Sequence, residues 1–408
     1  MRISTSMLNQ NAVNSIMEDE QQLTQTQNQL STGKSVNTPA DNPVAMVQLL
    51  QLDNTNSQYQ QYVSNGQAAN TNLTLEQQAL TTSTTTLQSI RDLVVQANTG
   101  TNSASDLKSI ATQISALESQ LQGLANSQNA QGEYLFAGFS SNTQPFVRGS
   151  SGSMSYVGDT GVNTVSINGG TSVQTGDAGS SVYMNIPAGN GTFSTAASAS
   201  NTGTGVVDAG SITDAAAWSA AASATPAGPP YTITFTDASD YSVTDASGNT
   251  VTTGTYDSTN GGEISFDGAE VGITGSPAAG DSFTVSPAGQ QSVFDTIDNV
   301  VNSLNNAGSS AAGRAQLSSQ LASALSNIDQ ASDQVSTVTS NVGSRISLIS
   351  SVNNDLTAAT TDVTTQISNV SDLDYAAATA QYSQEYIALQ AAEQSYADIN
   401  KLSLFNYL

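Results

Sequence analysis

An apolar residue at every seventh position constrains the C-terminal part of this chain more than any other feature. The series runs without a miss through Leu321, Ile328, Val335, Val342, Ile349, Leu356, Val363 and Val370. A strict period of seven predicts one long α-helix that supercoils in a left-handed sense against a partner helix. As a single helix this stretch would extend roughly 75 Å at 1.5 Å per residue. An ordinary helical bundle core would show the same stripe, so the pattern alone leaves both arrangements open.

A second helical region lies between Pro43 and Pro145, where the chain has no proline. Its seven-residue series comprises Leu52, Tyr59, Gly66, Leu73, Leu80, Leu87 and Val94. A later series alternates by three and four through Leu107, Ile110, Ile114, Leu117, Leu121 and Leu124. The polar stretch "NTGTNSAS" separates the two, and Ser105 with Lys108 gives only a partial capping signal for the second helix.

Residues 146–289 have a different character from both helical regions. They hold six of the nine prolines and alternating segments such as "YTITFTD", "GEISFDG" and "DSFTVSP", separated by "SGN", "NGG" and "AAGD" turns. This pattern predicts a β-rich insertion of one or two subdomains. We therefore predict an α+β fold, in which the N- and C-terminal arms form a long antiparallel helical rod or coiled coil around the insertion.

The segment "GEYLFAGF" places three large rings, Tyr134, Phe136 and Phe139, at the junction of the first arm and the insertion. The preceding 131 residues contain only two aromatic residues, Tyr59 and Tyr62. Gly132 and Gly138 permit a turn, and the rings can anchor the junction on the helices. We interpret the three rings as a structural clasp.

Charge and composition exclude several classes of function. With 8 basic and 33 acidic residues the formal net charge is −25, which argues against nucleic acid and anionic membrane surfaces as partners. Cysteine and histidine are absent, which excludes thiolate or imidazole zinc sites, cysteine nucleophiles and histidine-based triads. The N-terminus lacks the apolar core of a cleaved signal peptide, and no apolar run approaches a membrane span.

Motifs that suggest chemistry are weak. "LSTGKS" lacks the first glycine of a phosphate-binding loop, because Asn28 occupies that position, and Gly33 is better explained as a helix C-cap. "TDASDYSVTDASGN" lacks regular calcium-ligand spacing, and no lysine lies in a recognisable nucleophile motif. Scattered acids could pair for glycoside cleavage, but solvated surface acids are the default interpretation. We predict no catalytic residue, metal or cofactor, and hence no enzyme.

The two ends of the chain are the candidate assembly surface. Apolar stripes on the terminal segments comprise Ile16, Leu23 and Leu30 on one side and Tyr382, Leu389 and Tyr396 on the other. The last residues add an apolar cluster of Leu402, Leu404, Phe405 and Leu408. Such short stripes cannot bury a large core of their own, so we expect them to be covered in an assembly.

Both ends also resemble the flagellin superfamily. The segments that carry this resemblance are "MRISTSML", "QLSTGKSVNTPADNP", "IRDLVVQANTGTNSASDL", "LANSQNAQGEYLFAGF", "NVGSRISLISSVNNDL" and "SDLDYAAATAQYSQEYIALQAAEQSYADINKLSLFNYL". The resemblance covers roughly residues 1–147 and 290–408. Asn42 departs from the superfamily, which commonly has a second acid there. "GEYLFAGF" is more similar to the hook–filament junction branch than to flagellin itself.

This resemblance implies a layered organisation. The expected segments are a terminal coiled coil for export and assembly (1–45 and 371–408), helical rods (46–145 and 290–370) and an outer variable insertion (146–289). It further implies a secreted, extracellular subunit that assembles with copies of itself, a neighbouring hook-associated junction protein and flagellin, after type III export with a cytoplasmic chaperone. The alternatives are a flagellin, or a junction or filament protein whose outer domain is adhesive.

Overall fold

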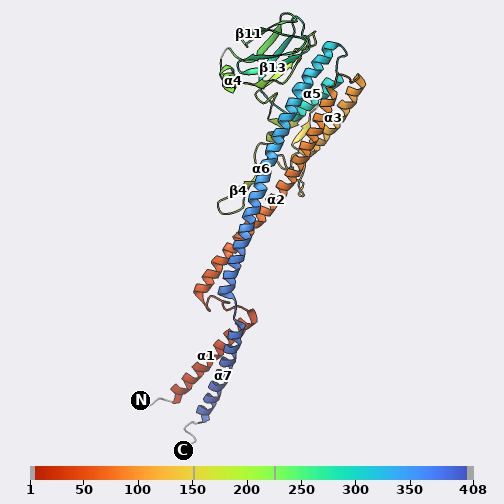
Figure 1. Ribbon diagram of the computed structural model, residues 1–408. Coiled ribbons are helices and arrows are strands. Elements are labelled where there is room, and N and C mark those ends of the chain that lie inside the picture. Colours follow the sequence, from red (N-terminus) through yellow and green to blue (C-terminus); the bar gives the residue numbers. More distant parts are fainter. Residues whose placement is uncertain (1–4, 150–151, 225–226, 402–408) are drawn as a thin grey trace, which may run out of the picture. The chain divides into compact units, whose positions relative to one another are not determined.

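The computed structural model describes residues 5–149, 152–224 and 227–401. Both ends of the chain form long helices and its middle part forms the strands, so the fold is α+β as predicted (Figure 1). The helices are α1 (Thr5–Thr32), α2 (Pro43–Ala97), α3 (Ala104–Ala125), α4 (Ala215–Ala222), α5 (Val293–Asn305), α6 (Ala311–Ser371), α7 (Tyr375–Lys401) and a short π-helix, η1 (Ser180–Met184). The predicted terminal cluster of Leu402, Leu404, Phe405 and Leu408 lies outside the described residues.

The strands fall almost entirely within the region in which the sequence predicts them. They are β1 (Phe146–Arg148), β2 (Met154–Tyr156), β3 (Thr164–Ser166), β4 (Ser172–Gln174), β5 (Ile186–Pro187), β6 (Phe193–Ala197), β7 (Val206–Val207), β8 (Ser211–Ile212), β9 (Tyr231–Phe235), β10 (Asp240–Thr244), β11 (Thr250–Thr255), β12 (Gly262–Phe266), β13 (Ala269–Thr274), β14 (Ser282–Pro287) and β15 (Gln290–Gln291).

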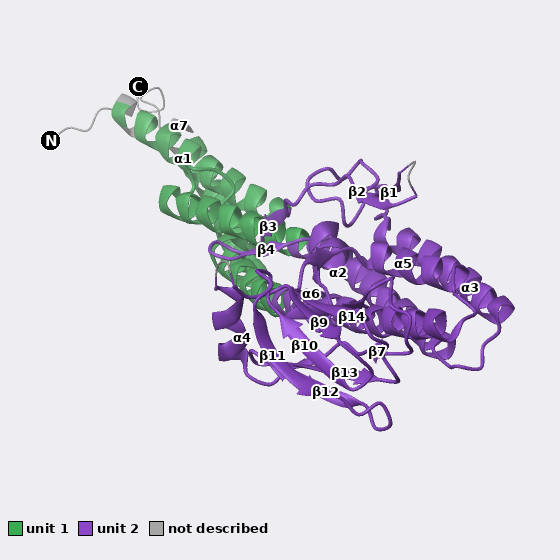
Figure 2. Ribbon diagram, turned by 90° about the horizontal axis from the view of Figure 1, so that it is seen from above, with its two compact units in different colours: residues 1–65, 351–408 green, residues 66–350 purple. Residues whose placement is uncertain are grey.

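The chain forms two compact units, coloured separately in Figure 2. One comprises residues 1–65 and 351–408, and the other comprises residues 66–350. In the first unit, α1 packs against α7. The division into five segments made from the sequence remains a prediction.

Within residues 66–350, α2 and α6 run antiparallel. Arg91 of α2 forms an ion pair with Asp329 of α6 at 2.7 Å, and Gln77 lies against Gly343. Partners farther along α2 therefore lie earlier along α6, as antiparallel pairing requires. The seven-residue series fills the interior: Leu73, Leu80, Leu87 and Val94 are fully buried, as are Leu321, Ile328, Val342 and Ile349. The predicted long helix is confirmed as α6.

The shorter α3 packs against α5. Its first turn differs from the sequence prediction, because Ser103 and Asp106 form a complete capping box where Ser105 and Lys108 were expected. The Ser103 backbone N–H donates to Asp106 Oδ2 at 3.0 Å, and the Asp106 N–H donates to Ser103 Oγ at 3.3 Å. Two N–H groups at the helix start, one at the cap and one in the first turn, are thus satisfied. The helix ends at Ala125, so the predicted helical stretch stops well before Pro145.

Two antiparallel sheets build the part of the insertion between Phe193 and Pro287. The five-stranded sheet has the order β11-β10-β9-β14-β6, and the four-stranded sheet has the order β12-β13-β7, with β8 also paired to β13. Strand β9 alternates buried Tyr231, Ile233 and Phe235 with partly exposed threonines, as a one-sided sheet requires. Both sheets contribute to one apolar core: Phe193, Val207, Trp218, Tyr231, Ile233, Phe235, Val243, Tyr256, Ile264, Phe266, Ala269, Val271, Ile273, Phe283 and Val285.

Candidate assembly surface

The predicted terminal stripes lie on the paired helices α1 and α7. Each of their residues is half-buried, none completely: Ile16, Leu23, Leu30, Tyr382, Leu389 and Tyr396. A helix pair thus covers only part of this apolar area. The ring of Tyr382 stacks on that of Tyr386 one turn later, with centroids 6.4 Å apart and planes 11° apart.

Other apolar side chains of this unit are more exposed than the predicted stripes. Val44 is 78% exposed, and Val47 and Leu50 follow it at intervals of three along the first turns of α2. This spacing places all three near one face of the helix. The sequence reasoning missed them, although "PVAMVQLL" shows the spacing directly after Pro43. Met17 of α1 and Ile387 of α7 are also exposed.

The joint between α1 and α2 is bonded to the joint between α6 and α7. Gly33 ends α1 with φ +72°, and its N–H donates to the Gln29 carbonyl oxygen at 2.8 Å, so the predicted C-cap is confirmed. Its own carbonyl oxygen accepts the Leu373 N–H at 3.0 Å. The Ser35 N–H donates to the Ser371 carbonyl oxygen at 2.7 Å. "LSTGKS" therefore acts as a structural joint between two helix ends.

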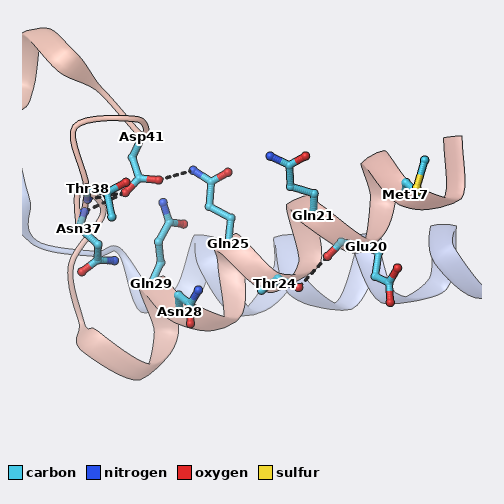
Figure 3. Close-up of a pocket in the computed structure, with 10 residues that line it drawn as sticks. All are labelled: Met17, Glu20, Gln21, Thr24, Gln25, Asn28, Gln29, Asn37, Thr38 and Asp41. Carbon is cyan, nitrogen blue, oxygen red and sulfur yellow. Dashed lines mark hydrogen bonds between the residues drawn. The ribbon is translucent and has the colours of Figure 1, made fainter. Parts of the chain in front are cut away.

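A polar groove of about 600 Å³ lies between α1 and the turn at residues 37–41 (Figure 3). Its lining is rich in amides and comprises Met17, Glu20, Gln21, Thr24, Gln25, Asn28, Gln29, Asn37, Thr38 and Asp41. Neutral amides are less costly to cover with protein than ionised groups are. The groove therefore suits contact with another polypeptide better than it suits a charged small molecule.

Asp41 organises the turn that forms one wall of this groove. Its carboxylate accepts the N–H groups of Thr38 at 2.8 Å and Asn37 at 3.0 Å, and the Gln25 amide at 3.1 Å. The pKa of Asp41 is lowered chiefly by the hydrogen bond from the Thr38 N–H, and the N–H of Asn37 has a smaller effect in the same direction. Figure 3 shows the Gln25 side chain of α1 pointing at this carboxylate. Asp41 thus fixes the turn against the helix.

The "GEYLFAGF" segment lies in the other compact unit, and its three rings have different environments. Phe136 is fully buried and meets Tyr183 edge to face, with centroids 5.6 Å apart. Tyr134 is half-buried. Phe139 departs from the expectation: it is 63% exposed, and its ring lies over Gly161 rather than on a helix. Phe136 is thus the ring that is buried as an anchor would be.

Phe136 joins an aromatic cluster that the sequence reasoning missed. We call the ring cluster the five residues Phe136, Phe146, Tyr156, Tyr183 and Phe294, whose rings are linked by centroid distances of 5.2–6.1 Å. The Tyr183 hydroxyl shares a hydrogen bond of 2.9 Å with Ser83 Oγ of α2, and burial raises its pKa. The cluster therefore connects the clasp, the base of the insertion, α2 and α5. Its five rings come from separate parts of the chain, so no local sequence pattern marks them as one cluster.

Asp159 binds the end of the clasp at Phe139. Its Oδ1 accepts the N–H groups of Phe139 at 2.9 Å and Gly161 at 2.7 Å, and Oδ2 accepts the Ser140 hydroxyl at 2.9 Å. The N–H of Phe139 is the largest cause of the lowered pKa of Asp159. Gly138, with φ +68°, lies so close to Asp159 that a Cβ there would clash with it.

The described residues contain no group of three or more acidic, histidine or cysteine side chains that could hold a metal ion. None of the helices within them is long and apolar enough to span a membrane.

Paired terminal helices, an antiparallel rod and an inserted β sandwich define an α+β protein of the flagellin type. Family models agree along most of the chain. The bacterial flagellin N-terminal helical region matches residues 3–141, and the C-terminal helical region matches residues 325–408. A third model, the D2-like domain of flagellar hook-associated protein 1, matches residues 196–287 within the insertion.

Individual proteins are also similar. Flagellar hook-associated protein 3 of Salmonella typhimurium is 31% identical over 186 residues, which cover 46% of this chain and 58% of that relative. The crystal structure of Xanthomonas campestris FlgL is 31% identical with a TM-score of 0.67, covering 75% of this chain and 98% of that one. The flagellar junction protein FlgL from Legionella pneumophila is 30% identical with a TM-score of 0.68, covering 79% and 100%. The chain belongs to the flagellin-like family of flagellar hook-associated protein 3.

Proposed function

We propose that this chain is a structural adaptor subunit of the bacterial flagellum, which joins the hook to the filament by assembling with copies of itself. The observation that carries the proposal is its similarity to solved FlgL proteins over nearly their whole length. One of these is named as a flagellar junction protein. Since the match to the Salmonella relative spans only 58% of it, the role of the whole protein is part of the proposal.

The terminal unit supplies the contacts for this role. Half-buried stripes on α1 and α7, the exposed face of α2 that begins at Val44, and the amide-rich groove beside Asp41 offer area to neighbouring subunits. The apolar cluster of Leu402, Leu404, Phe405 and Leu408 extends the same surface in sequence, outside the described residues. Burial of each large side chain would contribute about 1.5–3 kcal/mol before ordering costs are subtracted.

The partners and the location of the subunit follow from this role. The subunit would form a ring of identical copies between a neighbouring hook-associated junction protein and flagellin. It would leave the cell unfolded through the flagellar type III apparatus, with a cytoplasmic chaperone, and act outside the cell. The described surfaces support contact between proteins rather than catalysis, so we infer that the chain is not an enzyme and needs no cofactor.

The position of labelled protein on sheared flagella tests the junction role. We expect the label in one band at the distal end of the hook. Label along the whole filament would instead identify a flagellin. If the isolated insertion bound host glycans or matrix, its outer domain would have an adhesive role besides the junction.

A double substitution, Leu404→Ser with Phe405→Ser, tests the assembly surface. The monomer should unfold at nearly the same temperature as the wild type, while flagellin is shed into the medium because stable junctions no longer form. Asn406→Ser, a polar change in the same segment, is the matched control and should leave junctions intact. If the double variant unfolds many degrees lower as a monomer, these side chains belong to a core of the subunit itself.

A further inference from the structure

Glu76 is a buried acid in the middle of α2. The residue is 1% exposed, although it carries an ionisable group on a long helix. Its Oε1 accepts the backbone N–H of Asp177 at 3.0 Å. Its Oε2 is buried and has no hydrogen-bond partner among the described residues. An ionised carboxylate with one oxygen left unsatisfied in the interior would be strongly unfavourable.

The cation that acts on Glu76, Arg345, is already paired with another acid. Arg345 of α6 binds Asp177 with both terminal nitrogens, Nη1 to Oδ2 at 2.8 Å and Nη2 to Oδ1 at 3.0 Å. This fork-to-fork geometry uses both Asp177 oxygens. Two carboxyl groups therefore face one guanidinium, and an ionised Glu76 would leave an excess negative charge in the interior.

The surrounding groups favour a neutral Glu76. Burial is the largest cause that raises the pKa of Glu76 well above its ordinary value, and the charge of Asp177 is the next. The hydrogen bond from the Asp177 N–H and then the charge of Arg345 lower this pKa, but both are smaller effects. Tyr183 of η1 is a further titratable neighbour among the described residues, and burial raises its pKa too, so that it is neutral.

The segment that Glu76 binds connects the insertion to the long helices. Residues 176–184, which we call the latch segment, lead from β4 into η1 and carry Tyr183 into the ring cluster. The Gly179 N–H donates to the Phe136 carbonyl oxygen at 2.9 Å, and Gln334 of α6 donates to the Ser181 carbonyl oxygen at 2.7 Å. This segment therefore attaches the base of the insertion to both long helices.

We propose that Glu76 is a proton-operated latch: its neutral carboxyl group holds the latch segment on α2, and loss of its proton weakens that attachment. The structural basis is the buried Oε2 of Glu76, which has no hydrogen-bond partner among the described residues, beside an Arg345–Asp177 pair that already uses both Asp177 oxygens. The attachment of the insertion to the rod thus responds to pH.

The direction of the pH response follows from linkage. When the segment is detached, Glu76 has its ordinary pKa of 4.5. In the attached form its pKa is higher, so the carboxyl group keeps its proton to higher pH. Attachment is therefore strongest below that ordinary value and weakens as pH rises through the pKa of the attached form. For one proton, the attachment equilibrium changes by up to tenfold per pH unit in this window.

Hydrogen exchange of the latch segment in the full chain, between pH 5 and pH 8, tests the proposal. Each pH is corrected for the intrinsic exchange rate, and wild type is compared with Glu76→Gln. The wild-type protection factor should fall by up to tenfold per pH unit, while the Gln variant, which cannot ionise, should stay flat. Glu133→Gln, an exposed acid bonded to Asn129, is the matched control and should follow the wild type.

A second variant keeps the test decisive if Glu76→Gln does not fold. Asp177→Asn retains the backbone N–H that Glu76 accepts but removes the competing charge, and it makes Arg345 available to Glu76. The fall in protection above pH 5 should then disappear. If wild type and Glu76→Gln share one pH profile, or if Asp177→Asn retains the full pH dependence, Glu76 is not the latch.

Discussion

The backbone N–H of Ser35 donates to the carbonyl oxygen of Ser371 at 2.7 Å, which ties together two helix joints that lie 336 residues apart in the chain. The Ser35 hydroxyl lies 3.1 Å from the same carbonyl oxygen. Both bonds depend on the chain turning sharply at Gly33, whose carbonyl oxygen accepts the N–H of Leu373. The turn at Gly33 therefore joins the end of α1 to the segment that leads into α7.

Replacing Gly33 by alanine should weaken this joint. A side chain at φ +72° is strained, and a Cβ there would lie 2.9 Å from the Tyr375 hydroxyl oxygen. We expect a loss of about 1–2 kcal/mol, measured as faster hydrogen exchange at Ser35 and Leu373. Gly123→Ala is the control, because Gly123 is inside α3 with open space around it, and it should stabilise by about 0.5–1 kcal/mol. Equal effects of both changes would contradict this role for Gly33.

Truncating the two phenylalanines of the clasp should have very different effects. Phe136→Ala removes a fully buried ring from the ring cluster and should destabilise the fold by about 3–5 kcal/mol. Phe139→Ala removes an exposed ring and should change stability by about 0.5 kcal/mol. Urea unfolding followed by circular dichroism measures both. A large loss in the Phe139 variant would mean that its contact with Gly161 is a core contact.

Asp159 should stabilise the clasp only while it is ionised. Its pKa lies below the ordinary 3.8 in the folded chain, chiefly because it accepts the N–H of Phe139. A lowered pKa contributes stability above the unfolded value, and that stability is lost as pH falls through the folded value. Asp159→Asn should therefore be less stable than wild type at pH 7, and the difference should shrink below about pH 4.

Urea unfolding of both proteins at pH 7 and pH 3 measures this difference. Asp355→Asn, an exposed acid on α6, controls for the general loss of negative charge. A gap between Asp159→Asn and wild type that stays constant with pH would show that the carboxylate charge is irrelevant to the clasp.

Local and periodic signals accounted for most of the fold. The seven-residue series, the C-cap at Gly33 and the alternation in β9 each act within a few turns or residues, so the sequence displays them directly. The capping box at Ser103 was also local, but adjacent serines obscured which one begins the helix.

Contacts between distant segments could not be predicted in the same way. Phe136 meets Tyr183, and Glu76 meets Asp177 across 101 residues. Nothing in the immediate neighbourhood of either partner indicates the other, because the pairing depends on how loops close over the rod. The exposure of Phe139 has the same origin, since a turn held by Asp159 directs its ring onto Gly161.

The β sandwich should be removable without unfolding the rod, provided that its base is kept. Strands β5 and β15 pair at that base, and the Ala188 N–H donates to the Gly289 carbonyl oxygen at 2.9 Å. The chain thus leaves and re-enters the rod at adjacent points. Deleting residues 190–287 and joining the ends with a short glycine connector should leave the melting temperature of the helices within a few degrees of the wild type.

Deleting the whole predicted insertion, residues 146–289, should have the opposite result. That deletion removes Phe146 and Tyr183, both fully buried in the ring cluster, and leaves Phe136 and Phe294 without their partners. It also removes Arg148, which pairs with Glu118 of α3 and Asp298 of α5. Each lost ring alone is comparable to a core truncation of about 3–5 kcal/mol. The melting temperatures of the two deletion variants, measured side by side, test this difference. If the long deletion is as stable as the short one, the rod does not need the ring cluster.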